Sequence, residues 1–198
     1  AAAPAAAAAA QPKAVAPGGA DDAAEGSDEA ALTKLDIRCG RIMECGRVPD
    51  ADSLYLLKID IGEAQPRQVV SSLVKHYKEE ELKDRQVVVY CNIKPGKMRG
   101  FESQAMVLAA TQDKGAENEK CELLLPPKGC KEGARVQSGA TQVGSASEGV
   151  STKNISKVWG QVQPLLQMND KKEATFKGTT WTFPEGAITS GLTGCGIY

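Results

Sequence analysis

The 198-residue sequence predicts a mainly β protein, in which a small five-stranded barrel is followed by a smaller α+β module. Two observations lead to this fold class. Short apolar runs of strand length recur between turn-forming residues, at 35–48, 54–61, 67–72, 86–93 and 103–110. One short charged segment, KEEELKD at 78–84, separates the third and fourth runs and is predicted to form a helix. Five strands with a helix at this point favour a closed sheet.

The first apolar run changes its phase at a glycine. Ile37 and Cys39 share one face by alternation, whereas Ile42 carries the apolar side after Gly40. A phase change at glycine indicates a bulged or sharply bent strand. A long bent first strand lets a small sheet close, so the pattern favours an oligonucleotide/oligosaccharide-binding (OB) barrel, while other small barrels remain open.

The segments that follow the barrel predict two kinds of element. CELLLPP at 121–127 and EGARV at 132–136 are predicted to form a trailing hairpin, and the Gly/Ser-rich stretch 137–152 is predicted to be a loop. EATFKGTTWTF at 173–183 predicts a second hairpin that turns at Lys177-Gly178.

A helix is predicted at 155–163, where large apolar residues recur at helical spacing: Ile155, Val158, Trp159 and Val162. A module of about sixty residues buries little apolar surface by itself. We therefore divide the chain into an OB barrel at 32–136 and a C-terminal module at 137–198 that packs on it. Packing within one chain also predicts a monomer.

Residues 1–31 consist of Ala, Pro, Gly and acids with almost no large apolar side chain, which predicts a disordered tail or linker. The segment contains acids and no arginine, unlike a transit peptide. Because the chain does not begin with methionine, we expect it to be a piece of a longer protein.

Several functional classes are disfavoured by composition. The net charge is −1, and no apolar run is long enough to span a bilayer. Six cysteines without a CxxC pair, together with the single His76, argue against structural zinc and indicate a reducing compartment. Neither a phosphate-cradling loop nor a nucleophilic triad is evident. We therefore expect a cytoplasmic protein without enzymatic activity and without a cofactor.

One loop stands out, CNIKPGKMRGFESQAM at 91–106. Lys94, Lys97 and Arg99 lie within six residues with no acid among them, and Gly96 and Gly100 would let backbone approach a phosphate closely. An ordinary solvated turn is the alternative, because Pro-Gly is a common turn dipeptide. In an OB barrel, however, a loop at this position borders the nucleic-acid face.

Aromatic residues make up only 5% of the chain, and the barrel segment holds only Tyr55, Tyr77, Tyr90 and Phe101. Clustered cations with few aromatics favour recognition of backbone and shape over recognition of bases. A folded, double-helical RNA fits this better than single-stranded DNA.

The sequence closely resembles the tRNA-binding domain family in three blocks: LDIRCGRIMECGRVPDADSLYLLKIDIGEAQPRQVVSSLVKHY, CNIKPGKMRGFESQAMVLAA and LLPPKG. Members include endothelial-monocyte-activating polypeptide II and domains appended to some tyrosyl- and methionyl-tRNA synthetases. Further resemblance in KVWGQVQPLLQMND, EATFKG and GLTGCGIY is closest to the polypeptide II branch, which carries an extra C-terminal domain.

The resemblance implies an OB barrel that grips tRNA by its shape and delivers it to a synthetase or to a multi-synthetase complex. The family's loop signature falls on Asn92, Lys94, Lys97, Met98, Arg99, Gly100, Ser103, Gln104 and Met106. The cations would contact phosphates, and Ser103 would donate to sugar or phosphate. For Met106, core packing is an equal alternative.

Other residues and functions follow from the resemblance with less support. Arg38 and Arg41 are further candidates for RNA binding, and Ser71 and Ser72 match a family block but suit a structural role too. The chain could also be the C-terminal domain of a larger synthetase, or a released cytokine-like polypeptide, because RCGRIME at 38–44 resembles a segment linked to cytokine activity.

Overall fold

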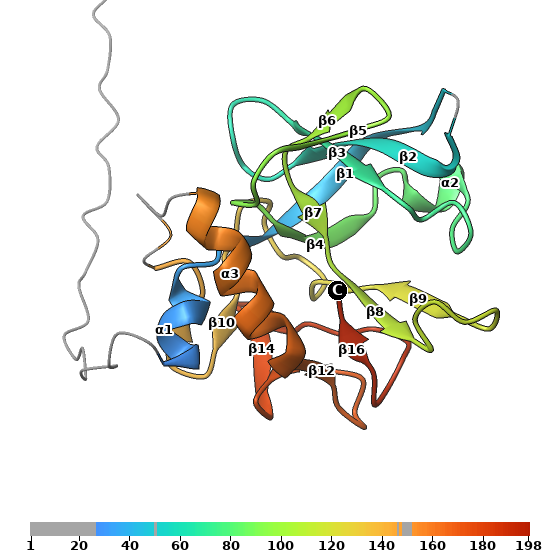
Figure 1. Ribbon diagram of the computed structural model, residues 1–198. Coiled ribbons are helices and arrows are strands. Elements are labelled where there is room, and N and C mark those ends of the chain that lie inside the picture. Colours follow the sequence, from blue (N-terminus) through green and yellow to red (C-terminus); the bar gives the residue numbers. More distant parts are fainter. Residues whose placement is uncertain (1–26, 50, 146, 148–151) are drawn as a thin grey trace, which may run out of the picture.

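The computed structural model describes residues 27–49, 51–145, 147 and 152–198. Figure 1 shows a barrel of antiparallel strands in its upper half and a module with the long helix α3 (Thr152–Val162) against it in the lower half. No helix in these described ranges is long and apolar enough to cross a membrane.

The barrel is a five-stranded antiparallel sheet in the order β3-β2-β1-β4-β7. Its bounds are β1 (Ile37–Val48), β2 (Ala51–Asp60), β3 (Arg67–Ser71), β4 (Gln86–Tyr90) and β7 (Met106–Val107). The edge strands β3 and β7 lie in contact, so the sheet nearly closes. The short helix α2 (Glu79–Leu82) joins β3 to β4. The predicted OB barrel with one short helix is thereby confirmed.

The phase change at Gly40 is also confirmed. Ile37 and Cys39 face the C-terminal module, whereas Ile42 points into the barrel interior. At the crossover the chain is so close to β2 that a Cβ on Gly40 would lie 2.8 Å from a methyl carbon of Ile59. A side chain at this position would collide with the core, and glycine allows the close approach.

Strand β4 is apolar throughout because both of its faces are buried. Val87 and Val89 point into the barrel, while Val88 and Tyr90 pack against the C-terminal module. All four are at most 2% exposed. A strand covered on both sides shows no alternation between apolar and polar residues, which explains the unbroken VVVY run.

The predicted fifth strand at 103–110 is wrong, because the chain there changes partners twice. It forms β6 (Phe101–Ser103), which pairs with β5 (Gly96–Met98), then β7, which pairs with β4, and then β8 (Ala109–Gln112). The predicted trailing hairpin is wrong too: β9 (Lys120–Leu123) pairs with β8, whereas residues 134–136 bond to the start of β1.

The C-terminal module is a small sheet covered by α3, followed by the 3-10 turn η1 (Gln163–Leu165). Its strands are β12 (Leu166–Met168), β13 (Ala174–Phe176), β14 (Thr179–Phe183), β15 (Gly186–Ala187) and β16 (Gly196–Ile197). The predicted hairpin with its turn at Lys177-Gly178 is confirmed. Part of the predicted loop at 137–152 is instead a hairpin of β10 (Gln137–Ser138) and β11 (Thr141–Gln142), because β10 pairs with β14. Residues 146 and 148–151 of that prediction lie outside the described residues.

The module shares one core with the barrel. Ile155, Val162 and Trp181 are at most 1% exposed and belong to the same cluster as Ile37 and Cys39. The Trp159 ring stacks on that of Tyr90, with centroids 4.8 Å apart. The last strand, β16, lies between β8, which follows the barrel strand β7, and β12 of the module (Figure 1). The predicted packing of the module on the barrel is confirmed.

The predicted tail extended too far along the chain. Asp28–Thr33 form the helix α1, whose N-terminus is capped by the Ser27 hydroxyl, an acceptor for the Ala30 N–H at 3.1 Å. Ala31 and Leu32 are buried in the core shared by barrel and module. This burial offsets the entropy of ordering six residues that look polar in sequence. Residues 1–26 lie outside the described residues.

Removing the C-terminal module should make the barrel self-associate. A chain of residues 27–136 would expose the outward face of β1 and β4, which includes Ile37, Val88 and Tyr90, and such apolar patches drive association. Sedimentation at several concentrations should give one subunit's mass for residues 27–198 and concentration-dependent larger species for 27–136. A shortened chain that stays folded and monomeric would contradict this interpretation of the interface.

Candidate functional site

The cationic loop forms a short hairpin that projects from the barrel. Strands β5 and β6 pair Lys97 with Glu102 and Met98 with Phe101, which leaves Arg99-Gly100 as a two-residue turn. Both turn residues have positive φ, 51° for Arg99 and 85° for Gly100. This backbone is that of a tight hairpin turn, in which glycine at the second position is favoured. The turn places the Arg99 side chain at the tip.

The cations of this hairpin are available to a ligand. Lys94, Lys97 and Arg99 are exposed, and within the described parts of the chain none of them forms an ion pair. The Met98 side chain is 43% exposed beside them. The predicted cationic surface therefore exists as a group of unpaired charges, and we call these four residues with Gly100 the hairpin tip.

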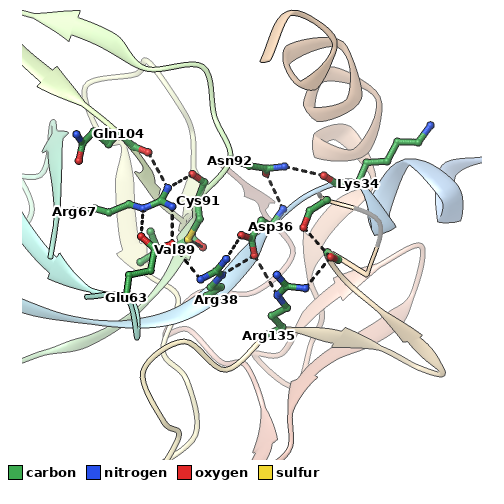
Figure 2. Close-up of polar contacts among 12 residues, drawn as sticks. Lys34, Asp36, Arg38, Glu63, Arg67, Val89, Cys91, Asn92, Gln104 and Arg135 are labelled. Carbon is green, nitrogen blue, oxygen red and sulfur yellow. Dashed lines mark hydrogen bonds and ion pairs between the residues drawn. The ribbon is translucent and has the colours of Figure 1, made fainter. Parts of the chain in front are cut away.

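A single guanidinium holds both ends of the loop that carries the tip. Arg67, at the start of β3, donates through Nη1 to the carbonyl of Cys91 at 2.5 Å and, at a longer 3.5 Å, to that of Gln104 (Figure 2). Its Nε and Nη2 donate to the two carboxylate oxygens of Glu63 at 2.9 and 2.7 Å. The fork of Arg67 thus joins the two ends of a fourteen-residue segment, 91–104, to one rigid strand.

Glu63 continues this network toward the start of β1. Arg38 donates to Glu63 at 3.3 Å and binds both oxygens of Asp36 through Nε and Nη2. Arg135 approaches the same Asp36 carboxylate at 3.6 Å (Figure 2). The hydrogen bonds from Arg67 hold the pKa of Glu63 below its ordinary value, against the opposing effect of partial burial. We call Asp36, Arg38, Glu63 and Arg67 the ion-pair network of the hairpin base.

Three predicted RNA contacts lie in this base, where each has a hydrogen-bond partner within the protein. Asn92 accepts from the N–H of Asp36 at 2.8 Å and donates to the Lys34 carbonyl at 2.9 Å. Ser103 is buried, accepts from the N–H of Val70 and donates to the Ala105 carbonyl, both at 3.0 Å. Gln104 is exposed, but its side-chain oxygen accepts from the Gln68 N–H at 3.3 Å. Their polar atoms fasten the hairpin to the barrel.

The two candidate arginines of β1 are likewise paired within the protein. The guanidinium of Arg38 forms ion pairs with Asp36 and Glu63, and that of Arg41 contacts a carboxylate oxygen of Glu132 at 2.7 Å. A paired cation offers little net charge to a phosphate. Met106 is half-buried against the core shared with the module, which favours its packing alternative. In the segment 38–44, Cys39, Gly40 and Ile42 are buried within β1.

A pocket of about 400 Å³ lies beside the hairpin. Lys94, Gly96 and Met98 line one side of it, and Ser71 and Ser72 line another. Lys114 and Tyr198 complete its wall, and sequence reasoning missed both. Lys114 stands in a loop of mixed charge, and Tyr198 comes from the far end of the chain. Only the pairing of β16 with β8 brings Tyr198 to this wall, and no local signal foretells that contact.

Comparison with known proteins decides what this surface belongs to. A family model described as "Putative tRNA binding domain" matches residues 37–135, half of the chain. The chain belongs to this family. As a tRNA-binding domain it also resembles the crystal structure of the C-terminal domain of Plasmodium vivax p43, with a TM-score of 0.76 and 31% identity over 84% of this chain and 98% of that one.

Two curated relatives carry the same domain in longer proteins. Aminoacyl tRNA synthase complex-interacting multifunctional protein 1 of Mus musculus is 44% identical over 146 residues, which cover 74% of this chain and 44% of the relative. Cytoplasmic tyrosine–tRNA ligase of Danio rerio is 44% identical over 162 residues, 82% of this chain and 30% of the relative. The tRNA-binding domain described here therefore spans less than half the length of these two relatives.

Replacing Arg67 by lysine should weaken RNA binding although Arg67 is not a contact residue. The charge is conserved, but an ammonium cannot reach Glu63 and the two loop carbonyls together. We expect faster amide hydrogen exchange across 94–101 and a loss of affinity for tRNA of about 3- to 10-fold. This loss is only part of the roughly 1.5–3 kcal/mol that hydrogen bonds to charged groups contribute, because lysine keeps the charge and some of the contacts. Arg85→Lys, on the Tyr77 ring, is the control. Unchanged exchange in Arg67→Lys would contradict the positioning role.

Acid should loosen the same hairpin base through Glu63. Because the folded-state pKa of Glu63 lies below its ordinary 4.5, its contribution to stability is fully present above pH 4.5 and is lost as the pH falls through the folded-state value. The difference in unfolding free energy between the parent and Glu63→Gln should therefore shrink on acidification below 4.5. If the difference in unfolding free energy between the parent and Glu63→Gln does not change with pH, ionised Glu63 does not stabilise the hairpin base as described.

Proposed function

We propose that this domain binds tRNA through the hairpin tip, recognises the shape and backbone of the tRNA, and assists aminoacylation by delivering it to a synthetase without catalysing a reaction itself. One observation carries the proposal. Arg38, Arg41 and Arg67 of the barrel are paired with carboxylates, whereas Lys94, Lys97 and Arg99 gather in one hairpin and form no ion pair within the described residues. Unpaired cations in an exposed group are what a phosphate backbone attracts.

The positions of the aromatic residues support recognition of the backbone. Tyr55 and Tyr90 are each 2% exposed and lie in the cores, and Phe101 packs against a small apolar cluster under the hairpin. Tyr77 is half-buried, with the Arg85 guanidinium over its ring. The described barrel residues therefore offer no row of exposed rings like those on which bases stack in proteins that bind single strands. Contacts to phosphates carry no information about base sequence, so we infer little preference among tRNA species.

The partners follow from the proteins in which the domain recurs. One relative is named as interacting with a synthetase complex, and another is itself a tyrosine–tRNA ligase. We propose that this chain works beside a cytoplasmic aminoacyl-tRNA synthetase or a multi-synthetase complex, as a monomer and without a cofactor. That the domain makes up 30% of a ligase favours a second candidate, in which it is the appended domain of a larger synthetase.

Alanine at Lys94, Lys97 and Arg99 together should weaken tRNA binding without changing which tRNAs are preferred. Each lost phosphate contact lowers the slope of log affinity against log salt by about 0.7–0.9, so the triple variant should lose about two units of slope. The free energy of unfolding should stay within about 0.5 kcal/mol of the parent, because the substituted side chains are exposed. Affinities for two unrelated tRNAs and one RNA duplex at three salt concentrations measure this.

The matched control is a second triple alanine variant at Lys128, Lys131 and Lys171, three exposed lysines that lie outside the hairpin. It removes the same total charge, so a specific hairpin site requires a much smaller effect. If the hairpin variant matches the parent at every salt concentration, the loop is only a turn and the RNA site lies elsewhere. If both triple variants lose the same slope, the attraction belongs to the overall charge and not to the hairpin.

A further inference from the structure

We propose that the pocket beside the hairpin receives one unstacked nucleotide of the bound RNA. This inference rests on the proposed function, because the hairpin tip and the pocket share residues: Lys94 and Met98 belong to the tip and also line the pocket. An RNA backbone held by the tip therefore passes the mouth of the pocket. The volume of about 400 Å³ lies in the range of small-ligand sites, about 300–1,000 Å³.

The floor of the pocket is apolar and built from small side chains. Ala105 and Ala109 are 1% and 6% exposed, Val107 is 7% exposed, and all three line the cavity together with the exposed thioether of Met98. Small side chains leave room for a flat ring, and apolar contact replaces the stacking that a base loses when it leaves its neighbours. This floor therefore suits the base of a nucleotide.

The rim of the pocket carries two cations on separate elements. Lys94 belongs to the hairpin tip, and Lys114 comes from the turn between β8 and β9. The Lys114 ammonium lies 3.4 Å from the centroid of the Tyr198 ring, a contact that fixes the charge at the mouth. The ring itself lies close to the backbone of β16, since a Cβ on Gly196 would be 3.1 Å from it. Two cations from separate elements of the pocket lining suit the phosphates that flank one nucleotide.

The remaining polar groups of the pocket agree with this ligand. Ser71 and Ser72 bring hydroxyl groups that can donate to and accept from a base edge or a ribose. The acid in the wall, Glu119, is engaged by the Gly115 N–H at 2.5 Å and lies 3.4 Å from the His76 imidazole, so it is not directed at the mouth as a free charge. An uncharged side chain of a protein partner would fill the floor but leave both rim lysines without a counter-charge.

The test compares two RNA probes that differ in one nucleotide. One is a blunt RNA duplex, and the other is the same duplex with a single unpaired 2-aminopurine nucleotide. The parent protein should bind the bulged duplex about 5- to 150-fold more tightly, since one base held on a protein surface contributes about 1–3 kcal/mol. The 2-aminopurine emission should change on binding, because the base leaves its stacked neighbours.

Two variants separate the pocket from the hairpin. Ser72→Trp fills the mouth from an exposed position and should abolish the preference for the bulge while leaving affinity for the blunt duplex within about twofold, because exposed substitutions away from a contact have small effects. Ser53→Trp, at an exposed serine of β2 outside the pocket, is its control. Lys114→Glu should reduce binding of the bulged duplex more than Lys131→Glu does.

The outcomes distinguish this proposal from the proposed function. Equal binding of blunt and bulged duplexes by the parent, or a bulge preference that survives in Ser72→Trp, overturns the pocket proposal and leaves the cavity to a protein partner. If the triple alanine variant of the hairpin still loses affinity for both duplexes in that case, the proposed function stands without it. If the hairpin variant binds both duplexes like the parent, the proposed function fails, whatever the bulge result.

Discussion

The hairpin that carries the unpaired cations depends on one guanidinium beneath it. Segment 91–104 holds three cations that repel one another, and a free loop of this length would lose conformational entropy on binding RNA. Arg67 removes much of that freedom beforehand, because it bonds to a carbonyl at each end of the segment while Glu63 holds it in place. The ion-pair network of the hairpin base ends at Asp36, whose N–H donates to Asn92. The same polar contacts therefore also fix the chain between α1 and β1.

Charge is therefore divided by location in this domain, although its net charge is only −1. On the barrel wall, Arg38, Arg41 and Arg67 have carboxylate partners, whereas the hairpin gathers three cations within six residues, none of which forms an ion pair within the described parts of the chain. A phosphate near the tip feels the local cations within about a Debye length, roughly 8 Å at physiological salt, more than the distant acids. The C-terminal module contributes differently. It covers the outward face of β1 and β4 and brings Tyr198 to the wall of the pocket.

The structural features that could be predicted from sequence are those determined by residues that are neighbours along the chain. The bend at Gly40, the short helix α2 and the turn at Lys177-Gly178 each have a local cause in glycine or in alternation. The hydrogen bonds that Asn92 and Ser103 accept could not be predicted, because the donors, the N–H groups of Asp36 and Val70, are 56 and 33 residues away. A polar residue in a signature looks the same in sequence whether it contacts RNA or fastens a loop. Helix α1 was missed because its order comes from tertiary burial of Leu32 and not from its own composition.

Amide hydrogen exchange of the chain with and without saturating tRNA shows whether tRNA binds at the hairpin, because it reports on every segment at once. The account predicts added protection at 94–101 and along the pocket rim at 71–76 and 112–115, with little change in the C-terminal strands β12 to β14. The backbone amides of the ion-pair network should already be protected from exchange without RNA. Protection that appears in the C-terminal module while the hairpin exchanges as before would contradict the account and move the tRNA surface to the other part of the molecule.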